Sequence, residues 1–267
     1  MRAHVLRATD VTLRVSGPTV AMMHRHKQHL AAVPQFKEPA TKDLLRDIMG
    51  DASVALVVKV AVLLAWFGML RVSEYVSDFR GDDEPDGSGM RLNGVKLNQR
   101  TGGYAVHCFR GKRDRYNTGF TVHYTPTTSS WECCPVRMLS AYLQHAVALD
   151  LHHYPSAPLL IHDNGGYVTR ADISKVLKDH AEAVGLPAQH ISTHSLRIGA
   201  AFALADKGIP WLEVVARARW SAATAADMYL LYCRISESRL CKLTASLDLI
   251  DPVSSFPLLS LRISHHV

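Results

Sequence analysis

Three positions in the sequence carry side chains suited to binding an anion. Arg71 follows an apolar run in GMLRVSEY, and His194 and Arg197 lie three residues apart in THSLR. Residues at this spacing share one face of a helix, and the free N–H groups at a helix start favour a bound anion. An arginine guanidinium adds a planar fork that matches two phosphate oxygens. The pattern indicates phosphate binding, while each arginine alone also fits a surface residue whose stem covers apolar neighbours.

A further segment, RWSAATAADMYLLY, contains Tyr229 and Tyr232, which also share a helix face. A free tyrosine hydroxyl has a pKa of about 10, so at neutral pH it is a poor nucleophile. Arginine and histidine side chains that offset the charge of phosphate oxygens would also give it the cationic surroundings it needs. Taken alone, the segment fits either a reactive tyrosine or two packing residues.

The elements that position these residues are predicted to be mainly helical. Thr41 is a plausible N-cap, Pro135 suits a first helical turn, and Thr169 with Asp172 resembles a capping box that precedes a stop at Gly185. Helices are therefore expected over 41–50, about 52–74, 133–149, 169–185, 193–208 and 210–220. The apolar run at 55–70 is shorter than the roughly 20 residues of a membrane span. It is better interpreted as a helix buried in a globular core.

A small antiparallel sheet completes the predicted fold. The alternating segments YAVHCF and FTVHY indicate strands. The region from Phe79 to Gly94 is rich in Gly, Asp and Pro and is expected to be a loop, and PSAPLLIHDNGGYV suggests a short strand and a turn. The fold class is therefore α+β, mainly α with a small antiparallel β-sheet.

Composition fits a globular protein, and its charge fits a polyanionic partner and an ordinary basic protein about equally well. The chain has 267 residues, of which 48% are hydrophobic and 20% charged, with a net charge of +6 and a pI near 9.1. A basic balance is a modest indication of a polyanionic partner. The five cysteines form no CxxC pair, which favours a reducing compartment. The opening MRAHVLRATD has no apolar signal segment.

Taken in order, these residues resemble the active-site set of the tyrosine recombinases, the integrase family of phages, bacteria and mobile elements. The set is Arg71, a basic residue in a β-hairpin, His194-x-x-Arg197, Trp220 and Tyr229. The strings HSLRIGAA, GMLRVSE and CCPVRMLSAYL each resemble a family segment. The resemblance implies a tyrosine recombinase catalytic-domain fold over 36–250, between a short N-terminal segment, 1–35, interpreted as the remnant of a core-binding domain, and a C-terminal tail, 251–267.

The resemblance implies a role for each matched residue. Arg71 and Arg197 would hold the non-bridging oxygens of a scissile phosphate, and His194 would hydrogen-bond to it and assist as a general acid/base. Trp220 would donate its indole N–H to the phosphate. Tyr229 would be the nucleophile, which leaves Tyr232 as a packing residue or a second hydrogen-bond donor.

Other roles fall on the predicted hairpin and on basic surfaces. Lys112 would protonate the leaving 5′ oxygen, although Arg110 and Arg113 lie close to it in FRGKRDR. Glu74 would hold the region of the first arginine. Contacts to DNA would come from basic residues, each of which also fits a solvated surface charge: Arg110, Arg113, Arg115, Arg170, Lys175 and Lys178.

The implied function is site-specific DNA recombination or integration for a phage or mobile element. The enzyme would cut and rejoin double-stranded DNA by transesterification through a covalent 3′-phosphotyrosyl intermediate, without metal, cofactor or ATP. It would assemble as a tetramer on DNA, away from membranes, inside the cell with its DNA, in the cytoplasm of a prokaryote or the nucleus of a eukaryote. Type IB topoisomerases use similar chemistry, but their size and other segments do not fit this chain.

Three departures from the family pattern leave an alternative open. Only some 35 residues precede the catalytic pattern, where family members carry a helical clamp domain, and Ala218-Arg219-Trp220 replaces the commoner Gly-His or Gly-Arg-Trp. The acidic loop over 79–94 also lengthens the sequence between Arg71 and Lys112. The alternative is a catalytically impaired DNA-binding remnant of a mobile element. A third interpretation, an unrelated helical protein with a coincidental motif, fits the combination of residues less well.

Overall fold

The computed structural model describes residues 37–77, 89–109, 118–128, 131–151, 155–229 and 231–232. The chain divides into two compact units, one running to Leu204 and the other starting at Ala205. The predicted end segments 1–35 and 251–267 lie outside the described residues, as do Lys112 and its basic neighbours at 110, 113 and 115. No helix in the described part of the chain is long and apolar enough to cross a membrane.

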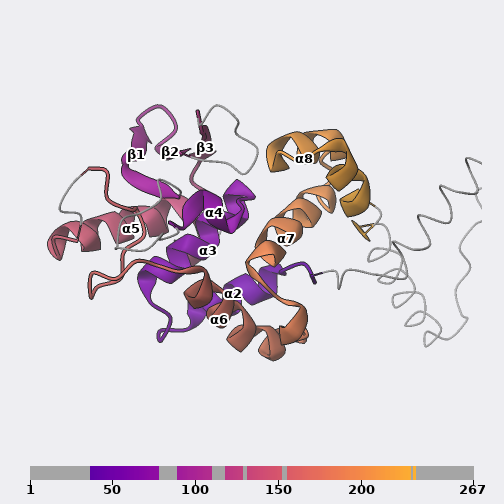
Figure 1. Ribbon diagram of the computed structural model, residues 1–267, viewed down its shortest axis with the longest axis horizontal. Coiled ribbons are helices and arrows are strands. Elements are labelled where there is room, and N and C mark those ends of the chain that lie inside the picture. The colour runs from indigo at the N-terminus through magenta and orange to yellow at the C-terminus, as the bar shows by residue number, and fades with distance from the viewer. Residues whose placement is uncertain are drawn as a thin grey trace, which may run out of the picture. The chain divides into compact units, whose positions relative to one another are not determined.

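The first unit is built around one central helix. Its helices are α2 (Lys42–Gly50), α3 (Leu56–Gly68), α4 (Val72–Tyr75), α5 (Pro135–Ala148), α6 (Arg170–Ala181) and α7 (Thr193–Ala205), with 3₁₀ turns η1 (Trp131–Cys133), η2 (Glu182–Val184) and η3 (Ala188–His190). Helix α3 is buried on nearly all sides and contacts α2, α4, α5, α6 and the sheet (Figure 1). The prediction of a core helix in this apolar run is confirmed.

Local signals set most helix boundaries as predicted. The N–H of Leu44 donates to Oγ1 of Thr41 at 3.2 Å and so caps α2. At α6, Asp172 N–H donates to Thr169 Oγ1 and Thr169 N–H donates back to the Asp172 carboxylate, which is the expected capping box with Asp in place of Glu. Gly185 follows at φ +73°, a left-handed conformation that glycine adopts without strain.

The prediction of one helix over 52–74 is wrong. Helix α3 starts at Leu56 and ends at Gly68, because Met69 adopts a left-handed conformation with φ of +49°. The N–H of Leu70 donates to the carbonyl of Ala65 and closes the helix end. The chain then resumes as the single turn α4, so Arg71 lies at a helix start rather than at a helix end.

The sheet has three antiparallel strands in the order β1 (Met90–Asn98), β2 (Gly103–Cys108) and β3 (Phe120–Tyr124). The two predicted strands are confirmed, but the loop expected over 79–94 is wrong for residues 90–94, which belong to β1. The register of β1 on β2 shifts between Met90 and Val95, and Gly94 lies within this irregularity. Between 155 and 168 the described residues form isolated bridges and a turn rather than a strand.

The two faces of the sheet differ in character. Cys108, Val106, Val122 and Tyr124 are buried, and the Tyr124 hydroxyl donates to the carbonyl of Leu64 in α3 at 3.0 Å. The residues between them in sequence point the other way, because side chains alternate along a strand. This outward face is formed by Lys96, Ala105, His107, Thr121 and His123, which the register pairs across the strands.

The second unit contains α8 (Trp211–Ala218) and a further helix whose described part begins at residue 222. Pro210 precedes α8 as predicted. Arg219 ends α8 in a left-handed conformation, φ +54°, and its N–H donates to the carbonyl of Ala216. The turn at Arg219 separates α8 from the helix that carries Tyr229.

Candidate active site

Arg71 is held in place by a carboxylate one helical turn away. Its backbone N–H donates to Glu74 Oε2 at 2.8 Å, and its Nη1 donates to Glu74 Oε1 at 2.9 Å. Glu74 is 1% exposed, whereas the Arg71 side chain remains partly exposed. The carboxylate therefore fixes both the backbone and the guanidinium of Arg71, which positions that side chain at the edge of the core.

Arg197 approaches the same carboxylate from α7. Its Nη1 donates to the carbonyl of Met69 at 3.0 Å and lies 3.7 Å from Glu74 Oε2. Arg197 is fully buried. The break between α3 and α4 is what presents the Met69 carbonyl to this guanidinium, so the helix end that the sequence did not predict is part of the site.

Arg71, Glu74 and Arg197 together form an arginine–glutamate cluster with an excess of positive charge. One buried carboxylate faces two guanidinium groups, and arginine stays protonated at any physiological pH. Charges removed from water interact strongly. The cluster is therefore suited to attract an anion, and the exposed part of Arg71 gives that anion a group to bind.

His194 lies close to this charge. The pKa of His194 is lowered, first because the surrounding protein limits hydration of the imidazolium, and second because the guanidiniums of Arg197 and Arg71 repel it. The side chain nonetheless keeps contact with solvent. His194 is therefore neutral at pH 7 and can accept a proton or donate a hydrogen bond.

The glycine in HSLRIGAA allows α7 to pack tightly. A Cβ on Gly199 would collide with the carbonyl of Ala40 and would lie 2.7 Å from Cζ3 of Trp66 in α3. The N–H of Ala40 also donates to the carbonyl of Ser195 at 2.9 Å. The small residue thus lets α7 approach both α3 and the segment before α2, which brings Arg197 to the cluster.

The predicted DNA-contacting residues on α6 are all on its surface. Arg170 is the first residue of the helix and is exposed, as is Lys178. Lys175 is also exposed and forms an ion pair with Asp179 at 2.7 Å, which offsets its charge. Among these three, Arg170 and Lys178 are therefore the more available for a phosphate.

In the second unit the predicted Trp220 and Tyr229 share an aromatic neighbour. Trp211 lies 5.8 Å from Trp220, 5.5 Å from Tyr229 and 6.0 Å from Tyr232, measured between ring centroids. These four residues are called the aromatic cluster. The indole N–H of Trp211 donates to the carbonyl of Ala225, which ties α8 to the following helix. Sequence reasoning missed Trp211, although its place at the start of α8 on the same side as Val214 and Ala218 was a usable signal.

The two tyrosines of this cluster differ in their surroundings. Tyr229 is 47% exposed, whereas Tyr232 is partly covered and its hydroxyl donates to Asp206 Oδ1 at 3.1 Å. Tyr232, which the sequence suggests as a packing residue or a second hydrogen-bond donor, lies with its ring 6.0 Å from that of Trp211 between centroids. Trp220 is largely buried.

Buried tyrosines elsewhere are unsuited to nucleophilic chemistry. Burial raises the pKa of Tyr142 to about 12, and its hydroxyl donates to the carbonyl of Leu159. Burial also raises the pKa of Tyr75 well above its usual range. Both hydroxyls stay protonated and inside the core, which leaves an exposed tyrosine such as Tyr229 as the better candidate. Within the described ranges, no group of three or more His, Cys, Asp or Glu side chains is placed to hold a metal ion.

No family model matches this sequence, and no curated protein matches it either. Solved structures do match. The fold is similar to that of the XerH site-specific recombinase bound to palindromic difH substrate in a post-cleavage complex, with a TM-score of 0.54 and 15% identity over 80% of this chain and 54% of that one. It is also similar to that of the XerA recombinase, with a TM-score of 0.51 and 15% identity over 77% of this chain and 64% of that one.

These similarities define the class of fold. The chain has the catalytic-domain fold of the tyrosine recombinases, mainly α with a small antiparallel sheet, as the sequence motifs predicted. The chain spans a little over half of the length of XerH and under two thirds of that of XerA.

Proposed function

We propose that this chain is a tyrosine recombinase that cuts and rejoins double-stranded DNA through a covalent 3′-phosphotyrosyl intermediate. The observation that carries the proposal is the arginine–glutamate cluster, where one buried carboxylate holds two guanidiniums and leaves a net positive charge beside His194. A site of this charge suits the equatorial oxygens of a phosphate undergoing transfer. The fold similarity to XerH and XerA supports the same conclusion.

In the proposed reaction Tyr229 supplies the nucleophile. Its hydroxyl oxygen forms a bond to the scissile phosphorus while the bond from phosphorus to the 5′ oxygen breaks. The phenolic proton passes to His194, which is neutral at pH 7 because its pKa is lowered. Lys112 gives a proton to the departing 5′ oxygen. The energy of the phosphodiester is kept in the phosphotyrosyl link, so a 5′ hydroxyl can later reverse the reaction without ATP.

Substrate positioning falls to the charged groups. Arg71 and Arg197 stabilise the phosphate oxygens, with Glu74 as the residue that positions both guanidiniums. Trp220 supplies an indole N–H donor. Contacts to the DNA backbone come from basic residues around the site, including Arg170, Lys175 and Lys178. Activity requires self-association, as a tetramer on paired DNA sites.

A covalent-capture experiment tests this function. Nicked duplex substrates that trap the intermediate, taken from the genomic flanks of the gene, are incubated with the protein and separated on a denaturing gel. A band of covalent protein–DNA complex is expected for the wild type, and Tyr229→Phe should abolish it while duplex binding is kept. Tyr232→Phe is the matched control and should retain the band.

The alternatives give different results in the same experiment. If Tyr232→Phe abolishes the band and Tyr229→Phe does not, the nucleophile is misassigned. If no flank substrate yields a band while duplex binding persists, the chain is a DNA-binding remnant. If neither a band nor binding is found, the proposal of a DNA-acting protein is overturned.

A further inference from the structure

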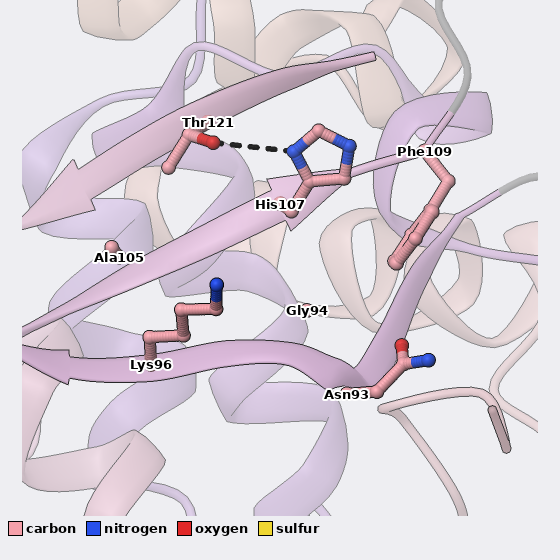
Figure 2. A pocket seen from close by; sticks show the side chains of 7 residues that line it. All are labelled: Asn93, Gly94, Lys96, Ala105, His107, Phe109 and Thr121. Carbon is pink, nitrogen blue, oxygen red and sulfur yellow. Dashed lines mark hydrogen bonds between the residues drawn. The ribbon is translucent and has the colours of Figure 1, made fainter. Parts of the chain in front are cut away.

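A hollow of about 360 Å³ lies on the outward face of the sheet, and none of its lining residues belongs to the arginine–glutamate cluster (Figure 2). Two of its lining residues, Gly94 and Ala105, are small. Its walls carry polar or aromatic groups: Asn93, Lys96, His107, Phe109 and Thr121. None of the described residues that line it has a carboxylate, so the hollow has a cationic rather than an acidic character.

The hollow is shaped by specific contacts rather than by loose packing. A Cβ on Gly94 would lie 2.9 Å from Cε2 of Phe109, so glycine allows the Phe109 ring to rest against β1. The Arg91 guanidinium lies 5.6 Å from the centroid of that ring, and His107 meets its edge at 4.7 Å between centroids. The aromatic wall is therefore fixed from both sides.

Two groups can meet a ligand. Figure 2 shows Lys96 extending from β1 toward β2, with its ammonium group at the hollow. The His107 ring hydrogen-bonds through Nδ1 to Thr121 Oγ1 at 3.2 Å, which orients it. Its other nitrogen lies beside Gly119, where a Cβ would come within 2.7 Å of it, so only a glycine fits against the ring at this position.

We propose that this hollow binds a backbone phosphate of DNA, distinct from the phosphate that is cleaved. The phosphate would contact the Lys96 ammonium and the sugar would lie against Ala105 and Phe109. The volume exceeds that of a free phosphate, and the pairing of one cationic wall with one apolar wall suits a phosphate attached to a sugar. This inference rests on the proposed DNA-binding function.

The position of the hollow agrees with this ligand. Phe109 is the last described residue before the connection between β2 and β3, whose sequence RGKRDR is strongly basic. A phosphate site at the end of β2 would therefore lie next in sequence to a basic segment. The contact would then secure DNA on the sheet, independently of the groups that act on the scissile phosphate.

The test measures duplex binding in a Tyr229→Phe background, so that no covalent complex forms. Fluorescence anisotropy is recorded with a duplex from the genomic flanks at several salt concentrations. Lys96→Ala should weaken binding by about three- to tenfold and lower the slope of log K against log salt by about 1, as expected for one lost phosphate contact. Lys96→Arg should restore both.

Two further variants distinguish a specific phosphate site from a general effect of positive charge on duplex affinity. Ala105→Leu fills the hollow without changing charge and should weaken binding like Lys96→Ala. Lys42→Ala removes one exposed lysine on α2 and should leave affinity within about twofold. Circular dichroism verifies that each variant is folded.

The outcomes distinguish this site from the proposed function. If Lys96→Ala and Lys42→Ala lose the same affinity for the duplex, or if Lys96→Ala binds as tightly as the parent protein, the proposed phosphate site on the sheet is overturned. The proposal that the protein binds DNA is then unaffected. If Ala105→Leu does not fold, the comparison of Lys96→Ala with Lys96→Arg still shows whether the charge at position 96 contributes to duplex binding. No duplex binding by the parent protein overturns both proposals.

Discussion

The arginine–glutamate cluster of the first unit and the aromatic cluster of the second hold their functional groups in opposite ways. In the first, a buried carboxylate fixes two guanidiniums through contacts of 2.9 and 3.7 Å. In the second, Trp211 contacts three aromatic rings, yet Tyr229 remains 47% exposed. The groups that would stabilise charge are held in place by a buried carboxylate, whereas the candidate nucleophile is about half exposed to solvent.

This difference has a physical basis. A guanidinium meant to stabilise a transition state must already be oriented, because reorienting it during the reaction would cost energy. A tyrosine that attacks a phosphate must instead reach a bulky ligand, and burial would raise its pKa as it does for Tyr142. The fixed guanidiniums of the arginine–glutamate cluster therefore suit the stabilisation of charge on a phosphate. The exposed tyrosine of the aromatic cluster suits nucleophilic attack.

The largest expected effect comes from removing the carboxylate of the first cluster. Glu74→Ala leaves two guanidiniums, one of them fully buried, without their shared counter-charge. Breaking a buried ion pair in this way costs about 3–5 kcal/mol. We expect a loss of that size in the free energy of unfolding, measured by urea denaturation of the whole chain.

A matched surface pair shows whether burial is the reason. Arg46 and Asp43 are 2.7 Å apart but have side chains that are 68% and 73% exposed. Asp43→Ala should cost less than about 1 kcal/mol, since exposed ion pairs contribute little. Similar small losses for both variants would show that Glu74 does not hold the cluster together.

The aromatic cluster should respond less strongly and more locally. Trp211→Ala removes three ring contacts, each worth roughly 0.5–1.5 kcal/mol, from a residue that is only partly buried. We expect a loss of about 2 kcal/mol in the stability of the second unit. Hydrogen exchange should quicken for the amides of 222–229 and stay unchanged in α3.

The neighbouring residue provides the control for this variant. Leu212 lies on the same helix and is 79% exposed. Leu212→Ala should alter stability by no more than about 0.5 kcal/mol. If it quickens exchange at 222–229 as much as Trp211→Ala does, the ring contacts are not what holds that helix.

The parts of the fold that the sequence predicted are those with local causes. The caps at Thr41 and Thr169 and the prolines at 135 and 210 act within one helical turn, so their signals are readable in a single segment. The break after Gly68 was missed because the left-handed residue is Met69, and a methionine gives no warning of that conformation. The first residues of β1, MRLNG, were missed because their glycine and polar residues fit a loop equally well.

The site was predictable only in part, and for a related reason. Arg71, His194 and Arg197 are far apart in sequence, so only their resemblance to a family pattern joined them. Nothing in the local sequence indicates that the Met69 carbonyl meets Arg197, since that contact depends on how α7 packs on α3. The hollow on the sheet likewise depends on strand register, which places Lys96 opposite Ala105.

A smaller effect should separate the two tyrosines of the aromatic cluster. Tyr232→Phe removes the hydrogen bond to Asp206, which is worth about 0.5–1 kcal/mol at a partly exposed position. A double-mutant cycle with Asp206→Ala measures the coupling in urea denaturation. Additive losses from the two single variants would show that the hydroxyl and the carboxylate do not interact in solution.

The smallest effect concerns proton binding by His194. Its pKa is lowered, first by limited hydration and then by the charges of Arg197 and Arg71, so the folded state binds protons less readily than the unfolded state. The contribution of His194 to the free energy of unfolding is therefore fully present above the pKa of the unfolded state, about 6.5. It declines as the pH falls from there toward the lowered pKa of the folded state. His194→Asn should flatten that part of the profile of unfolding free energy against pH.

The same residue reports on the charge of the cluster. Glu74→Gln removes one negative charge while keeping a side chain that can still accept hydrogen bonds from Arg71, so the guanidiniums should repel the imidazolium more strongly. We expect the pKa of His194, followed by NMR of its ring protons, to fall further in Glu74→Gln and to stay unchanged in Asp43→Asn. An unchanged value in both variants would mean that limited hydration alone lowers the pKa. In that case the excess charge inferred for the cluster does not reach the place where a phosphate would bind.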